Sequence, residues 1–279
     1  MDLISRIALF LILLSTGGFI VYIIKQSESV FRYSYWVLFS GFIVHTIFFV
    51  HQYFSLGVMP VVNLKLSLSF FAWCITGIYL LFQMRFRLMV LGSFVAPLAA
   101  FFMILSSTVS GSVEPVPPVL KSIWLIIHVF TIFLGDGMFA IAFVAAVMYL
   151  IQERQIKNKT RGNFFQRLPS LETLDSIGYH SLIYGFPLLT LGMITGAIYA
   201  QHALGSYWRW DPKEVWSLIT WLAYAILLHE RLAVGWRGRR AAYISILCFT
   251  VLIFTFLGSS IWLNSYHSFS GFGEVGKLP

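Results

Sequence analysis

The sequence predicts an all-α polytopic membrane protein with about eight transmembrane helices. Apolar residues make up 58% of its 279 residues, charged residues only 11%, and the mean hydropathy is +0.81. A water-soluble chain carries about 25% charged residues. Apolar runs close to the ~20 residues that a bilayer-spanning helix needs also recur along the whole chain. Together these observations exclude a water-soluble globular fold.

Eight apolar runs define the expected helices. They cover residues 3–24, 33–54, 64–82, 88–107, 122–150, 178–201, 214–232 and 243–263. The first run lacks the small-residue cleavage site of a secretory signal peptide and is long enough to cross a bilayer, so we expect it to remain as a helix. The longest polar link, residues 152–177, is too short to form a domain. We therefore expect one membrane domain over residues 1–279.

The basic residues predict the orientation of these helices. The inner ends of the runs that end at residues 24, 82, 150 and 232, together with the loops that follow them, hold thirteen of the nineteen Lys and Arg residues. Cytoplasmic loops of membrane proteins are enriched in Lys and Arg, so both termini should lie on the outer side. We expect a multi-pass protein of the bacterial inner (cytoplasmic) membrane, with the periplasm outside, rather than a plastid thylakoid protein. The same asymmetry accounts for the net charge of +8, so no nucleic-acid partner is expected.

The stretch 205–221, GSYWRWDPKEVWSLITW, combines many aromatic residues with a helix start. Asp211 is placed to be the N-cap, Pro212 to take the first helical position, and Glu214 to complete a capping box. The preceding loop then holds indoles above the seventh helix, which suits a large, flat, mostly apolar ligand. An interfacial aromatic belt is the alternative, although a belt scatters its rings over many helix ends. The aromatic residues of the stretch are Tyr207, Trp208, Trp210, Trp216 and Trp221.

Three of the seven histidines lie at informative depths. His128 falls roughly 8 Å below the outer end of the fifth helix, and His267 falls just past the outer end of the eighth. Both therefore lie near the level of the tryptophan loop. His229 lies about 27 Å further along the seventh helix, close to the inner surface. Two imidazoles that approach from opposite sides suit a six-coordinate heme iron, with indoles packed on the porphyrin. For each histidine the alternative is a neutral hydrogen-bonding residue between helices.

Other polar residues have no single interpretation. Asp136 lies two turns below His128 in the apolar part of the fifth helix, where an acid is a functional hypothesis by default. It could orient an imidazole, meet a heme propionate, or cap a glycine kink. Four further histidines stay unassigned: His45, His51, His180 near the inner start of the sixth helix, and His202 before the tryptophan loop.

The tryptophan stretch resembles a known family. Gly205, Trp208, Trp210 and Asp211 match the WWD signature of the heme-handling proteins of cytochrome c assembly. The resemblance extends over about 121–269, through DPKEVWSLITWLAYAILLHER and the segments around His128 and His267. Eight segments with the signature between the sixth and seventh are similar to the CcsA/ResC type of System II. The chain departs from the family at Leu204, where Trp is usual, so we expect weaker packing at one heme edge.

The resemblance implies a function and roles for the matched residues. Such proteins form a cytochrome c synthase with a CcsB/ResB-type membrane subunit, and attach heme b to the CxxCH cysteines of an apocytochrome c. A thiol-reducing thioredoxin-like protein is a further implied partner. His128 and His267 would be the axial ligands of an outer heme, and His229 would bind an inner heme together with the partner subunit. The implied cofactor contacts are Gly205, Tyr207, Trp208, Trp210, Asp211, Trp216 and Trp221.

Three other functions remain open from the sequence. A heme exporter of the CcmC type shares the signature but hands heme to a chaperone, and has about six segments rather than eight. A cytochrome b-like electron-transfer protein stacks two histidine pairs across the bilayer, whereas here the deep partner of His229 is missing. A heme-free transporter would leave the tryptophan loop without a purpose.

Overall fold

A computed structural model of the chain describes residues 3–109, 120–158 and 167–258. Those residues form helices and connecting turns and contain no strand. Eight of the helices in them are long and apolar enough to cross a membrane, which confirms an all-α polytopic membrane protein. The helices are α1 (Leu3–Lys25), α2 (Glu28–Leu56), α3 (Leu64–Phe86), α4 (Gly92–Thr108), α5 (Ile123–Lys157), α6 (Leu171–Leu204), α7 (Pro212–His229) and α8 (Arg239–Ile253). The short helix η1 (Met89–Leu91) precedes α4, and the π-helices η4 (Glu230–Val234) and η5 (Phe254–Gly258) continue α7 and α8.

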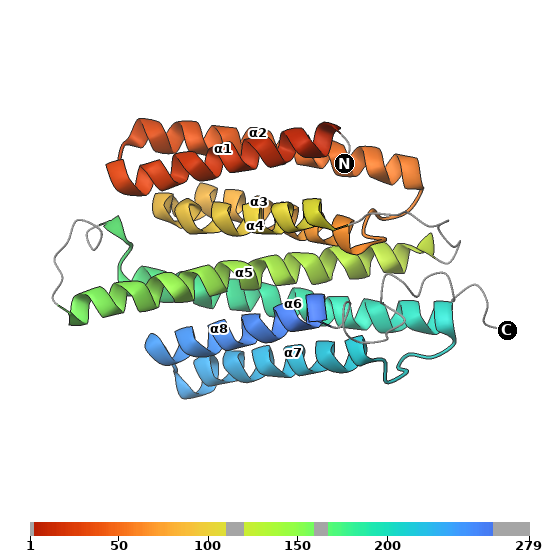
Figure 1. Ribbon diagram of the computed structural model, residues 1–279. Helices are drawn as coiled ribbons and strands as arrows, with labels where there is room; N and C mark the ends of the chain where they lie inside the picture. Colours follow the sequence, from red (N-terminus) through yellow and green to blue (C-terminus); the bar gives the residue numbers. More distant parts are fainter. Residues whose placement is uncertain (1–2, 110–119, 159–166, 259–279) are drawn as a thin grey trace.

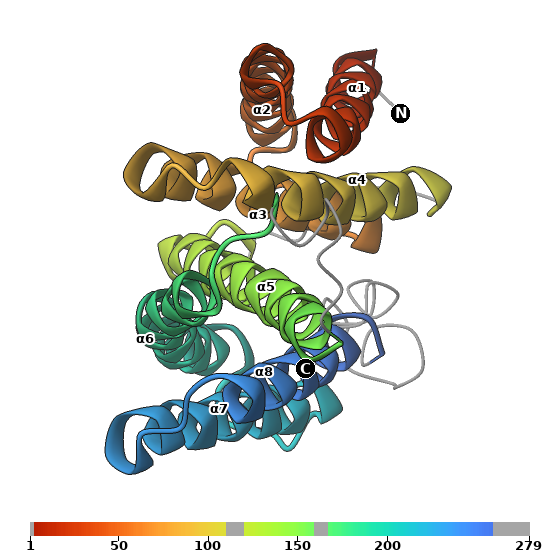
Figure 2. The ribbon, with the colours of Figure 1, turned by 90° about the vertical axis from the view of Figure 1, so that its left-hand side faces the viewer.

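The helices stack in pairs (Figure 1). The pair α1 and α2 is followed by α3 and α4, then by α5 and α6, and last by α7 and α8. Figure 2 shows the same order from one end. Helix α5 has extensive contacts with α6, α8 and α3, so it joins the helices that precede it in the chain to those that follow it. Fully buried aromatic side chains come from α3, α4 and α5, among them Phe70, Phe102 and Phe139, and also from α1 (Phe19) and α7 (Tyr224).

Four helices begin earlier than the apolar runs indicate, and the difference is largest for α2 and α6. Helix α2 begins at Glu28 rather than at residue 33, and α6 begins at Leu171 rather than at 178. In α6 the added turns are polar, and the side chain of Ser170 caps them by accepting a hydrogen bond from the Thr173 N–H at 3.2 Å. Hydropathy marks only the apolar part of a helix, which explains the difference. One consequence is that His180 lies well inside α6 and not at its start.

The two ends of the bundle differ in charge. Lys25, Arg85 and Arg154 lie in the last turns of α1, α3 and α5, and Arg239 begins α8. The opposite end carries the starts of α1 and α5 and the connection between α6 and α7 (Figure 1). The tryptophan loop and the start of α1 therefore share one end, as expected. That this end faces the outer side remains a prediction, and the C-terminal residues lie outside the described part.

An ion pair fastens the α7–α8 hairpin to α6 at the basic end. A guanidinium nitrogen of Arg231 lies 2.8 Å from Oδ2 of Asp175, and the arginine side chain is only 5% exposed. The backbone N–H of Gly238 donates to Oδ1 of the same carboxylate at 2.8 Å. One partly buried acid thus holds both sides of the turn that precedes α8.

His45 is a packing residue of the N-terminal half. Its ring is fully buried, stacks on Phe49 with ring centroids 4.9 Å apart, and has Nε2 at 2.8 Å from the Ser69 hydroxyl. These contacts join α2 to α3, two helices that lie far from the tryptophan loop in the sequence.

Candidate functional site

The tryptophan loop is fixed at both ends by its own sequence. Helix α6 stops at Gly205, whose φ of 72° is left-handed and whose N–H donates to the Gln201 carbonyl. Glycine takes this conformation without a steric penalty, which explains its use as a helix C-cap. Helix α7 starts at Asp211 with Pro212 in the first turn, and Asp211 and Glu214 form a capping box. The expectation from the DPKE spacing is confirmed.

Glu214 does more than cap the helix. Its Oε2 accepts hydrogen bonds from the N–H groups of Arg209 at 2.9 Å and Asp211 at 3.2 Å. Trp210 lies between these two residues and has a φ of 59°, a left-handed conformation that is an outlier for a bulky side chain. Such strain persists only where neighbouring contacts enforce it. The carboxylate therefore holds Trp210 with its indole turned outward, 77% exposed.

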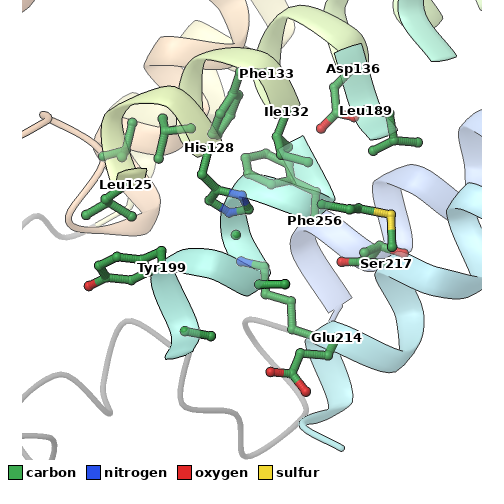
Figure 3. Close-up of a pocket in the computed structure, with 18 of the residues that line it drawn as sticks. Leu125, His128, Ile132, Phe133, Asp136, Leu189, Tyr199, Glu214, Ser217 and Phe256 are labelled. Atoms are coloured by element: carbon green, nitrogen blue, oxygen red, sulfur yellow. The ribbon is translucent and has the colours of Figure 1, made fainter. Parts of the chain in front are cut away.

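A cavity of about 270 Å³ lies beneath this loop and opens to the surface. Figure 3 shows its walls: His128, Phe133 and Asp136 project from α5, Glu214 and Ser217 from α7, and Phe256 from η5. Residues of α6 and of the segment leading into α3 complete the wall, which is predominantly apolar. A mostly apolar cavity with a few directed polar groups is the usual form of a small-molecule site.

His128 is held in a defined orientation at the cavity wall. Its Nδ1 lies 2.7 Å from the carbonyl oxygen of Gly192 on α6. Because a carbonyl oxygen only accepts hydrogen bonds, Nδ1 carries the proton, and in the neutral ring Nε2 carries the lone pair. Gly196 permits this approach, since a Cβ there would lie 2.5 Å from Nδ1. A second-sphere bond of this kind is typical of histidines that bind metals.

The aromatic residues of the signature separate into two groups. Tyr207 and Trp208 line the cavity, whereas Trp210, Trp216 and Trp221 are not among its lining residues. Trp216 packs against Phe254, with ring centroids 4.5 Å apart. The indole N–H of Trp221 donates a hydrogen bond to the Thr190 hydroxyl at 2.9 Å. Periodicity shows which tryptophans lie in the loop and which in the helix, but not which of them reach the cavity.

Besides Glu214, the cavity wall contains two charged residues, Asp136 and Lys213. Asp136, 8% exposed, lines the cavity from α5, and Lys213 lines it from the first turn of α7. The sequence left the role of Asp136 open between an imidazole partner, a propionate partner and the cap of a glycine kink, and it did not single out Lys213. The only signal for it was a cation directly before an apolar run.

The π-helix η5 shapes the far wall. It supplies Thr255 and Phe256 to the cavity, and the Thr255 hydroxyl lies 2.7 Å from the hydroxyl of Thr220 on α7. Short π-helical turns occur often at functional sites because they redirect side chains. No feature of the sequence indicated this change in helix geometry.

The other predicted iron ligands lie elsewhere. His229 is exposed at the last residue of α7, at the opposite end of the bundle from the cavity. His180 is half-buried, and its Nδ1 lies 2.8 Å from the Ser176 carbonyl of its own helix. His267 falls outside the described residues, and so does any contact it makes with the cavity.

Comparison with known proteins identifies the family. The family model described as "Cytochrome C assembly protein" matches residues 61–267, which include the tryptophan loop and every residue of the cavity wall except Met59. The chain belongs to the cytochrome c assembly protein family. This membership confirms the family resemblance of the sequence and gives the protein a role in cytochrome c biogenesis.

Curated relatives of the family cover most of the chain. A protein from Guillardia theta called cytochrome c biogenesis protein CcsA is 34% identical over 267 residues, which cover 88% of each chain. A relative of the same name from Chlamydomonas reinhardtii is 38% identical over 225 residues, which cover 77% of this chain and 62% of the relative. Another, from Microcystis aeruginosa, is 31% identical over 269 residues, which cover 79% of this chain and 82% of the relative.

A solved structure has the same fold. The chain called cytochrome c heme lyase CcmF aligns with a TM-score of 0.67 at 16% identity. The alignment covers 99% of this chain and 51% of that one, so this protein spans about half the length of its structural neighbour. At this identity the likeness shows the fold alone.

Proposed function

We propose that this chain is the heme-binding membrane subunit of a two-subunit cytochrome c synthase. In this role it moves heme b to the outer face of the membrane and presents it, in ferrous form, to the CxxCH cysteines of an apocytochrome c. The observation that carries the proposal is His128, oriented by the Gly192 carbonyl at the wall of an apolar cavity in a member of the cytochrome c assembly family.

The residues of the cavity fit a heme. Phe133, Trp208 and Phe256 provide aromatic surface for a porphyrin, and His128 provides a ligand for its iron. The cavity volume of about 270 Å³ is slightly below the range of about 300–1,000 Å³ that is usual for ligand sites. Because the cavity opens to the surface, these dimensions suit a heme that keeps one edge outside, where thiols can reach it.

The chemistry requires positioning rather than a catalytic acid or nucleophile. Bound heme supplies the vinyl groups, and each cysteine thiol adds across one vinyl double bond without a leaving group. His128 holds the iron from one side, and we propose His267 as the opposite ligand. The histidine of CxxCH then displaces one of the two ligands, which releases the product. Placing vinyl groups against thiols is the kind of proximity effect that accelerates such reactions strongly.

A second heme site belongs at the other end of the bundle. We propose that His229 binds this inner heme and that the opposing ligand comes from a CcsB/ResB-type partner. The exposure of His229 at the end of α7 supports this division, because an exposed imidazole is available to a second subunit. We further propose a bacterial cytoplasmic membrane location, with the basic end on the cytoplasmic side, and a thioredoxin-like protein that reduces the thiols.

Replacement of His128 tests the outer site. In the complex with its partner, His128→Ala should lower heme content or shift the absorption spectrum toward oxidised heme, and added imidazole should restore part of the signal. His202→Ala is the control, because His202 is exposed near the end of α6 and does not line the cavity. Full heme occupancy with an unchanged spectrum in His128→Ala would contradict the proposal. A co-expressed CxxCH reporter separates a synthase from a heme exporter, since only a synthase makes the thioethers.

A further inference from the structure

Lys213 is the only lysine or arginine among the described residues that line the cavity. The other charged side chains there are the carboxylates of Asp136 and Glu214. Glu214 is already engaged, because its Oε2 accepts two backbone hydrogen bonds in the tryptophan loop. The polar part of the cavity is therefore a lysine, a buried aspartate and an oriented imidazole.

The position of Lys213 is fixed by the helix cap. Its backbone N–H donates to Oδ2 of Asp211 at 3.1 Å, which sets the point where the side chain leaves α7. Lys213 lines the cavity from this first turn of α7, and Asp136 lines the same cavity from α5. The start of a helix also carries a partial positive charge, which adds to that of the lysine.

This arrangement suits a ligand that carries a carboxylate. A heme has two propionate carboxylates on one edge and its vinyl groups on other edges. In an apolar cavity an ionised carboxylate needs a cationic partner, because an unpaired buried charge is strongly unfavourable. Of the residues described at this cavity, Lys213 is the one that can supply that charge.

We propose that Lys213 binds a propionate of the heme, and that Asp136, which lines the same cavity, competes with the propionate for Lys213. The inference rests on the proposed function. It makes Lys213 a positioning residue: anchoring the propionate edge at the start of α7 fixes the rotation of the ring about the iron. The vinyl groups then point away from α7. In the empty cavity Asp136 offers the lysine a carboxylate, and the propionate takes over this role when heme binds.

The two residues should have opposite effects on heme affinity. Lys213→Gln removes the partner of the propionate, and the loss of a charged hydrogen bond corresponds to about a tenfold weaker binding. Lys213→Arg should retain most of the affinity because it keeps the charge. Asp136→Asn removes the competitor, so it should strengthen binding by about threefold or more. If Lys213 and Asp136 only maintained the fold, heme binding would be weaker in both Lys213→Gln and Asp136→Asn.

Titration of the purified complex with two hemes tests this inference. Ferric heme and its dimethyl ester, in which both carboxylates are blocked, are added to the heme-depleted protein, and the absorption change gives each Kd. Wild type, Lys213→Gln and Asp136→Asn should bind the dimethyl ester alike, within about twofold. Lys65→Gln is a matched control, since Lys65 lies in the first turn of α3 at the same end of the bundle and does not line the cavity. It should change neither Kd.

The outcomes distinguish the inference from the proposed function. Equal weakening of both hemes by Lys213→Gln, or weaker heme binding in Asp136→Asn, would overturn the propionate assignment while the heme site stood. An unchanged Kd for heme in Lys213→Gln would also overturn it. Failure of the wild-type complex to bind either heme would instead overturn the proposed function.

Discussion

The orientation of His128 depends on a glycine in the facing helix. A Cβ at Gly196 would lie 2.5 Å from Nδ1 of His128 and 2.6 Å from its Cε1, distances that force the ring to move. We therefore expect Gly196→Ala to break the hydrogen bond to the Gly192 carbonyl and to lower heme content by about tenfold, in the range found when a second-sphere partner of a metal ligand is lost. Heme content and the absorption spectrum of the purified complex measure this.

The control for that change lies in the same helix. Gly178 has no atom within 4 Å of the position of an added Cβ, so Gly178→Ala should leave heme content unchanged. Alanine is also the better helix former, so neither variant should lose stability through helix propensity. If Gly196→Ala bound heme with a normal spectrum, the Gly192 bond would not be needed to orient the ligand.

Contacts between residues close together in the sequence were predictable, whereas contacts across the bundle were not. Asp211 and Glu214 were expected as caps because a capping box is set by a spacing of three residues. The contact of Glu214 with the Arg209 N–H, and with it the left-handed Trp210, depends on the shape of the loop. The place of Lys213 at the cavity depends on how α7 packs beside α5, which periodicity does not determine.

At the scale of elements, the attachment of the α7–α8 hairpin to α6 gives a stability prediction. Asp175→Asn leaves Arg231, whose side chain is 5% exposed, without its carboxylate. Removing one partner of a buried ion pair costs about 3–5 kcal/mol. We expect a clear fall in Tm, measured by thermal unfolding of the purified protein in detergent, together with faster proteolysis of the turn before α8.

An exposed ion pair provides the comparison. Arg32 and Glu28 in α2 are 3.8 Å apart, with side chains 71% and 73% exposed. Exposed pairs contribute about 0–1 kcal/mol, so Glu28→Gln should barely change Tm. Equal shifts in the two variants would mean that the Asp175 pair is not a buried anchor.

The elements themselves followed from hydropathy, but not all of their ends did. Eight apolar runs correspond to eight spanning helices because a bilayer requires about 20 apolar residues for each. The polar first turns of α2 and α6 were missed because helices continue into the interface wherever their caps allow. The π-helix η5 was missed because its geometry arises from packing against α7, where Thr255 meets Thr220.

At the scale of the whole molecule, the cavity and His229 lie at opposite ends of the bundle. The cavity is lined by the first half of α7, whereas His229 ends this helix, about 26 Å by helical rise from the start of its 18 residues beside the tryptophan loop. One heme therefore cannot contact both His128 and His229. If both histidines bind heme, two sites exist and heme must pass between them.

The inner site should form only in the complex. We expect His229→Ala to reduce heme in the complex with the partner subunit and to starve the outer site, because heme entering from the cytoplasm would no longer be held for transfer. The outer ligands would remain intact. Heme content per complex, together with the yield of a CxxCH reporter cytochrome, measures both effects.

His180 is the internal competitor, and its surroundings argue against it. Its Nδ1 is 2.8 Å from the Ser176 carbonyl, and its ring lies among those of Phe86, Tyr179 and Tyr184, whereas His229 is exposed. His180→Ala should therefore change heme content little. An inner heme found in this chain purified alone, and lost on His180→Ala, would refute the two-subunit arrangement. Its absence from the chain alone, and its appearance with the partner, would support it.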